Sequence, residues 1–143
     1  MKHTFAFFTT VLQKQFRNYC QIELQKHGIS HGQLFFILYI GKHPQCSPKE
    51  VSVQLHLDTG HTTRALFKLE QAQLIIQDIN PLDKRARLLS LTPHGEEIFK
   101  LSHEFFNQWD QETLQCLSSN ERETLLILLN KIMINTQERK NLS

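Results

Sequence analysis

Residues 47–95 read SPKEVSVQLHLDTGHTTRALFKLEQAQLIIQDINPLDKRARLLSLTPHG, and this stretch decides the fold. It opens with Ser at an N-cap, Pro at the first helical position and Glu at the third, which together predict a helix start at 47–50. Asp58 is placed to cap a second helix that runs to Ala72 with an apolar stripe at helical spacing. The stretch therefore predicts two helices that meet across a tight turn.

After these helices the hydrophobic pattern becomes strand-like. Isoleucines at 75, 76 and 79 and leucines at 88, 89 and 91 flank residues 80–83, whose sequence Asn-Pro-Leu-Asp is typical of a turn. One β-hairpin with a basic tip is expected there. A helix, a tight turn, a second helix and a basic hairpin follow the order of a winged helix-turn-helix, whose second helix enters the major groove of DNA.

Helices are also expected on both sides of this unit. Capping boxes at 30–33 and 118–121 and the Thr-Pro pair at 92–93 each predict a helix start, and the apolar run at 34–40 predicts a central core helix. The first and last helices carry more apolar surface than one core-facing stripe requires, which favours a homodimer. The residues expected at that interface are Phe5, Phe8, Leu12, Leu125, Leu128, Leu129 and Ile132.

The expected fold class is mainly α with a small β-hairpin wing: a winged helix-turn-helix whose N- and C-terminal helices form a dimerisation region. A length of 143 residues suits one domain, with the winged helix-turn-helix at 30–92 and dimerisation helices at 1–27 and 93–137. The chain has no signal-peptide pattern and no apolar run near the ~20 residues that cross a bilayer. A cytoplasmic protein is expected.

Composition argues against a metal protein and against an enzyme. The three cysteines are widely separated and lack a Cys-x-x-Cys pair, which favours reduced thiols over a zinc ribbon. His27 and His31 have i, i+4 spacing, but Gly28 and a predicted cap interrupt the helix between them, so a surface pair is favoured over a metal site. No phosphate loop, nucleophile elbow or His-Glu-x-x-His helix is present, so no catalytic residue, metal or cofactor is expected.

The outward face of the second helix follows from its periodicity. With Leu69 at the centre of the buried face, a rotation of 100° per residue turns Thr63, Arg64 and Phe67 outward. Arginine suits bidentate recognition of guanine, so Arg64 is the first candidate for base contact, although a solvated helix face also explains it. The expected DNA-binding residues are Ser47, Thr59, Gly60, His61, Thr63, Arg64, Lys68, Asp83, Lys84, Arg85 and Arg87.

The hairpin tip concentrates positive charge. An arginine on a projecting ribbon suits the narrow and electronegative minor groove, and Arg85 is expected there with Asp83 orienting it by a salt bridge. A solvated basic turn is the alternative for the tip. Ser47 can place its hydroxyl and nearby backbone N–H groups against a phosphate, but capping alone explains this residue equally well.

From Ile29 to Phe99 the sequence resembles the MarR family of bacterial transcriptional regulators. The resemblance lies in Ser-Pro-Lys-Glu at 47–50, Thr-Thr-Arg-Ala-Leu at 62–66 and the wing sequence at 83–95. It implies an obligate dimer that is formed by the terminal helices and binds a pseudo-palindromic operator. It further implies release of DNA when a small aromatic or amphipathic compound binds between the dimerisation and DNA-binding parts.

Two positions depart from the pattern of that family. Gln73 stands where a glycine commonly precedes the first wing strand, and Phe67 occupies a position that is often basic. Phe67 either touches a thymine methyl group or packs under the wing, and packing is the favoured interpretation. Aromatic side chains that can line an effector cleft are more typical of core, and no ligand residue is assigned; they are Phe16, Tyr19, Phe36 and Trp109.

The sequence thus predicts a sequence-specific regulator that binds double-stranded DNA, acting as a ligand-responsive repressor and a homodimer. Two alternatives stay open. A winged helix can serve as a protein-interaction module, because fold alone does not fix function. Thiol-based redox sensing through Cys20 is the other, although a buried thiol in mid-helix is usually inert.

Overall fold

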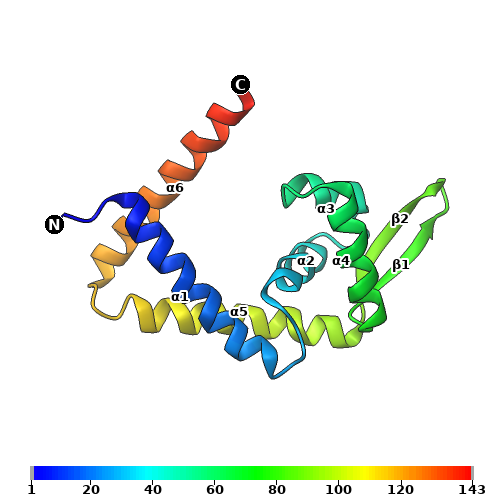
Figure 1. The fold of residues 1–143 in the computed structure, drawn as a ribbon, viewed down its shortest axis with the longest axis horizontal. Coiled ribbons are helices and arrows are strands. Elements are labelled where there is room, and N and C mark those ends of the chain that lie inside the picture. The colour runs from blue at the N-terminus through cyan, green and yellow to red at the C-terminus, as the bar shows by residue number, and fades with distance from the viewer. Residues whose placement is uncertain (1, 143) are drawn as a thin grey trace. The chain divides into compact units, whose positions relative to one another are not determined.

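A computed structural model describes residues 2–142, which form two compact units that divide between Phe106 and Asn107. Figure 1 shows the elements in chain order. They are α1 (Phe5–Gln25), α2 (His31–Lys42), α3 (Pro48–Gln54), α4 (Thr59–Gln71), β1 (Ile75–Asn80), β2 (Asp83–Leu91), α5 (Pro93–Thr113) and α6 (Ser119–Leu142). The expected fold class, mainly helical with one hairpin wing, is confirmed.

The predicted helix starts of the first unit are confirmed in their hydrogen bonds. At α2 the Gln33 N–H donates to the Ser30 hydroxyl at 3.3 Å, and the Ser30 N–H donates to the Gln33 side chain at 2.9 Å. At α3 the same reciprocal pair joins Ser47 and Glu50, with both distances 3.1 Å. Each box satisfies two backbone N–H groups that would otherwise lack a partner at the helix end.

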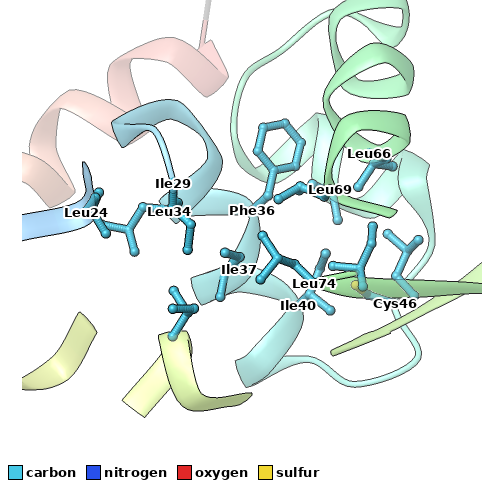
Figure 2. Close-up of a cluster of buried hydrophobic side chains, with 14 of the residues drawn as sticks. Leu24, Ile29, Leu34, Phe36, Ile37, Ile40, Cys46, Leu66, Leu69 and Leu74 are labelled. Atoms are coloured by element: carbon cyan, nitrogen blue, oxygen red, sulfur yellow. The ribbon is translucent and has the colours of Figure 1, made fainter. Parts of the chain in front are cut away.

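Helix α2 lies at the centre of the core, as its apolar sequence predicts. Its side chains Leu34, Phe36, Ile37 and Ile40 are buried, and Figure 2 shows them between Leu24 and Ile29 on one side and Leu66 and Leu69 of α4 on the other. The buried face of α4 consists of Thr62, Leu66 and Leu69. This packing fixes which face of α4 remains exposed to solvent.

The wing is an antiparallel pair with one irregularity. Residues pair in register from Ile75 with Leu91 to Ile79 with Arg87, and the register shifts before Asn80 pairs with Asp83. The root of the wing has a further connection that the sequence did not predict. Leu89 of β2 accepts a hydrogen bond from the Gln45 N–H at 2.7 Å, and its own N–H donates to the Cys46 carbonyl at 2.8 Å.

Helix α4 ends in a Schellman motif with Gln73 in the left-handed region. The Leu74 N–H donates to the Leu69 carbonyl and the Gln73 N–H donates to the Glu70 carbonyl, both at 3.0 Å. Gln73 has a φ of 60°, a conformation that glycine adopts without strain and other L-residues adopt at a cost. The family that the sequence resembles commonly has a glycine at this position, and the left-handed backbone explains that preference.

Replacing Gln73 with glycine should therefore stabilise the fold by about 0.5–1 kcal/mol and raise Tm by about 2–4 °C. The reciprocal change Gly28→Gln is the matched control, since Gly28 has a φ of 70° and no atom within 4 Å of an added Cβ. Thermal unfolding followed by circular dichroism should show Tm changes of opposite sign for the two variants. Equal changes in the same direction would contradict backbone strain as the cause.

The second unit contains the end of α5 and all of α6. Ser118 and Glu121 form the predicted capping box, with hydrogen bonds of 2.9 and 3.2 Å, and the Arg122 guanidinium donates to the Leu114 carbonyl at 3.3 Å. Among the described residues of α6 none is buried, although the helix is rich in leucine and isoleucine. Nowhere in residues 2–142 is a helix both long and apolar enough to cross a membrane.

Candidate nucleic-acid interface

The exposed face of α4 carries the predicted contact residues. Asp58 caps the helix by accepting from the His61 N–H at 2.7 Å, and the Thr62 hydroxyl donates to the Asp58 carbonyl at 2.9 Å. These bonds fix the start of α4 and hence the direction of every side chain along it. The predicted outward residues are all exposed: Gly60, Thr63, Arg64, Phe67 and Gln71, with His61 and Lys68 on the flanks.

The wing and the start of α3 meet on one side of α4. A hollow of about 450 Å³ is lined there by residues of three elements. It brings the predicted residues Ser47, Thr59 and Thr63 together with Arg85 and Arg87. Its rim combines the N-terminal ends of α3 and α4 with two arginines, so it presents backbone donors and positive charge to the same region.

A second hollow lies on the other side of α4, beside the start of α2. Its volume is about 490 Å³, and His61, Arg64 and Lys68 form its α4 wall. The facing wall includes Ser30 and Gln33 of the α2 capping box. Arg64 thus stands between solvent and this hollow, where an anion would meet both a guanidinium and an ammonium group.

Two carboxylates near α4 are bonded to backbone groups, and no ion pair within residues 2–142 involves a cation of α4 or the wing. Glu50 accepts from the Ser47 N–H, and Asp58 accepts from the His61 N–H. Ion pairs join Lys26 with Glu23 and His94 with Glu97, and neither involves a cation of α4 or the wing. The side chains of Arg64, Lys68, Lys84, Arg85 and Arg87 are therefore available to phosphates.

The predicted salt bridge between Asp83 and Arg85 is wrong. The Asp83 carboxylate instead accepts the Arg85 backbone N–H at 3.1 Å, as an Asx turn does, and the Leu82 N–H donates to the Asn80 side chain at 2.9 Å. A short side chain in a tight turn reaches a backbone N–H two residues ahead more readily than a long guanidinium. The tip is therefore shaped by Asp83, while Arg85 is exposed and lines the hollow beside α3 and α4.

Comparison with known proteins decides the family. The model of the MarR family matches residues 29–86. Over 132 residues the chain is 40% identical to the HTH-type transcriptional regulator BilQ of Clostridium symbiosum, and the match covers 92% of each chain. The chain belongs to the MarR family. As a member of this family it is a winged helix-turn-helix transcriptional regulator and not an enzyme.

Solved structures share the fold of this MarR-family chain. A crystal structure of MarR superposes with a TM-score of 0.89 at 20% identity, covering 99% of this chain and 97% of the other. A MarR family regulator from Listeria monocytogenes, crystallised with a 26mer DNA, superposes with a TM-score of 0.83 at 22% identity, covering 97% and 92%. Both comparisons show the same architecture at low sequence identity.

Sequence reasoning did not single out two exposed residues near the candidate interface of this MarR-family chain. Lys49 lines the hollow between α3 and the wing, and Leu82 at the tip of the wing is 95% exposed. Lys49 had a readable signal, because a cation in the first turn of a helix opposes the helix dipole and is more easily explained by an anionic partner. Leu82 gave none, since a single apolar residue in a turn is common.

The expectation that Phe67 packs under the wing is not supported. Its side chain is 56% exposed, whereas Leu66 beside it in the sequence is 1% exposed. The helical rotation that buries Leu66 against the core turns Phe67 to the outer face of α4. An aromatic ring is therefore part of the surface that carries Arg64.

The cysteines argue against the redox alternative for this MarR-family regulator. Burial raises the pKa of Cys20 to about 11, and burial together with the Glu50 charge raises the pKa of Cys46 to about 11. The thiolate is the reactive form, and it is disfavoured in both side chains at neutral pH. Cys116 is exposed, but it belongs to the second unit and is distant from α4 in the sequence.

At pH 8 a disulfide reagent such as Ellman's should modify one thiol of the native protein rapidly, that of Cys116. With a pKa of about 11, only about one in a thousand molecules carries a thiolate at Cys20 at this pH, and burial blocks the reagent as well. The two buried thiols should react only in denaturant. Rapid loss of the Cys20 thiol in a Cys116→Ser variant would reinstate the redox hypothesis.

Proposed function

We propose that this MarR-family regulator is a homodimer that binds a pseudo-palindromic operator in double-stranded DNA, as a ligand-responsive repressor in the cytoplasm. The observation that carries the proposal is the outward Arg64 on α4 beside a basic wing, with the cations of both elements free of ion pairs. Each subunit then places one α4 in a major groove and one wing in the neighbouring minor groove.

The proposed roles follow the chemistry of each group. Arg64 reads guanine in the major groove, and Arg85 enters the minor groove. Ser47 and Lys49, at the start of α3, hold a phosphate between them. The remaining candidates on α4 and the wing position the subunit through phosphate and sugar contacts; they are Thr59, Gly60, His61, Thr63, Lys68, Asp83, Lys84 and Arg87.

The proposed dimer is formed by helices within 1–27 and 93–137. Its support is apolar side chains that each unit leaves exposed: Phe5, Phe8 and Leu12 on α1, and Leu128, Leu129 and Ile132 on α6, with Leu125 half-buried. Exposed apolar surface of this extent on the helices of one subunit is typical of a protein–protein interface. A two-fold dimer also supplies two α4 helices for the two halves of a palindrome.

The proposed effector is a small amphipathic or aromatic molecule. Its support is the hollow that Arg64 and Lys68 share with the start of α2, which has Phe36 and Ala65 as apolar lining. An aromatic carboxylate bound there would pair with cations that the DNA also needs. Effector and operator would then compete for the same side chains, which lowers DNA affinity without a large movement.

The test is fluorescence anisotropy with duplex DNA from upstream of the regulator's own gene, across a salt series. Arg64→Ala should weaken dimer binding by about 30-fold or more, since a bidentate contact to guanine contributes about 1–3 kcal/mol per half-site and the dimer loses two of them. Arg85→Ala should reduce the salt slope by about one per subunit. Arg139→Ala removes an equal charge from α6 and is the matched control, with unchanged affinity expected.

The outcomes separate this proposal from the protein-interaction module. Saturable binding that weakens steeply with salt and depends on Arg64 supports an operator-binding dimer. Salt-dependent binding that is the same for all DNA sequences and unchanged by Arg64→Ala would show only a non-specific basic surface and contradict operator recognition. Absence of binding at low salt would overturn the proposal in favour of a protein partner.

A further inference from the structure

Phe67 is a large apolar side chain on a helix face that otherwise consists of polar and charged groups. It is 56% exposed, while Leu69 on the buried face of α4 is fully buried. An exposed phenylalanine ring leaves apolar surface in contact with water, which is unfavourable, and the ring adds nothing to the core of this subunit. A ligand that covers the ring would recover that cost.

The position of Phe67 on α4 points to the ligand. Phe67 follows Arg64 by three residues and Thr63 by four, the spacings at which side chains stand next to one another on a helix. The Thr63 hydroxyl donates to the Thr59 carbonyl at 2.9 Å, so its proton is already used within the helix. This flank of α4 therefore offers a ring and a methyl group, while Arg64 offers the hydrogen-bond donors.

We propose that Phe67 reads the C5-methyl group of a thymine in the major groove of each half-site. This inference rests on the proposed function, and it adds a base preference to it. Thymine alone among the four bases presents a methyl group in the major groove, and a phenyl ring can recognise it by contact without any hydrogen bond. Phe67 is thus a specificity residue beside Arg64.

The charge around the ring selects DNA over a protein occupant. Arg64 and Lys68 flank Phe67 along the helix, and neither forms an ion pair within residues 2–142. An apolar protein surface placed on the ring would bury both cations without compensation, which is costly. Duplex DNA supplies phosphates to the cations and methyl groups to the ring at the same time.

The experiment compares thymine with uracil, which differ only by the methyl group. The bound duplex from the anisotropy assay is synthesised with each symmetry-related pair of thymines replaced by uracil, and its affinity is measured for the wild-type protein, Phe67→Ala and Leu82→Ala. At one symmetry-related pair of thymines, replacement by uracil should lower wild-type affinity about fourfold per methyl group, or about 15-fold for both half-sites. This is the effect expected when each half-site loses one buried methyl-sized contact.

Phe67→Ala should bind the thymine duplex more weakly than the wild type and show no difference between thymine and uracil. Leu82→Ala removes another exposed apolar side chain and should retain the full uracil effect. Equal uracil effects in the wild type and Phe67→Ala, or no effect at any thymine, would overturn the inference while operator binding stands. Failure of the wild type to bind any duplex would overturn the proposed function itself, and this inference with it.

Discussion

Replacement of Gly95 by alanine is expected to destabilise the fold by about 3 kcal/mol. Gly95 is buried in the first turn of α5, and an added Cβ would overlap the Leu74 carbonyl oxygen and lie 3.3 Å from the Leu91 Cβ. The backbone at Leu74 cannot yield cheaply, because its N–H donates to Leu69 and its carbonyl accepts the Thr92 N–H at 3.1 Å. The methyl group therefore forces α5 away from the wing root.

Urea unfolding and thermal melting measure this effect, with a fall in Tm of about 10 °C for a chain of this size. Gly32→Ala is the matched control, because its Cβ meets nothing within 4 Å and lies in a helix. That variant should be neutral or gain up to about 1 kcal/mol. A stability loss of similar size in both variants would contradict steric overlap at Gly95.

The double substitution Leu128→Asp and Ile132→Asp is expected to convert the proposed dimer into monomers and to abolish high-affinity operator binding. Four apolar side chains leave the interface of each dimer, at about 1.5–3 kcal/mol each, and four carboxylates enter it. The dimer dissociation constant should rise on the order of 10⁴-fold or more. Sedimentation velocity across a protein dilution series measures the change.

Asn130→Asp combined with Gln137→Asp is the control, since it adds the same charge to the opposite face of α6. This pair should remain dimeric and bind DNA. Each subunit of the aspartate variant should keep its folded winged helix-turn-helix, because no side chain of α6 is buried. A variant that stays dimeric at nanomolar concentration would place the interface elsewhere.

Features of the fold that depend on neighbours in the sequence could be predicted from the sequence. The boxes at Ser30, Ser47 and Ser118 satisfy backbone groups three residues away, so their geometry is encoded within four residues. The outward direction of Arg64 followed from the helical repeat and the buried position of Leu69 alone. Such local rules therefore predict the helix starts and the exposed face of α4 in the first unit.

Features that depend on distant contacts or on competition between bonds could not be read in this way. Asp83 had two possible partners in Arg85, and only the folded turn shows that the backbone N–H is chosen over the guanidinium. The bridge between Cys46 and Leu89 joins residues 43 positions apart, and no local pattern encodes it. Phe67 had two plausible environments, and packing of the core decides between them.

The bridge at Leu89 anchors the hairpin at its root and leaves its tip without a second support. Near its root β2 is held on one side by β1 and on the other by the backbone of Gln45 and Cys46. Toward the tip the contact with Gln45 and Cys46 ends, and the pairing with β1 shifts register between Ile79 and Asn80 before Asn80 pairs with Asp83. We therefore expect bending to occur mainly in the last few residues of the wing, which would let its tip fit grooves of different width in the proposed operator while the base of the hairpin keeps its place beside Cys46.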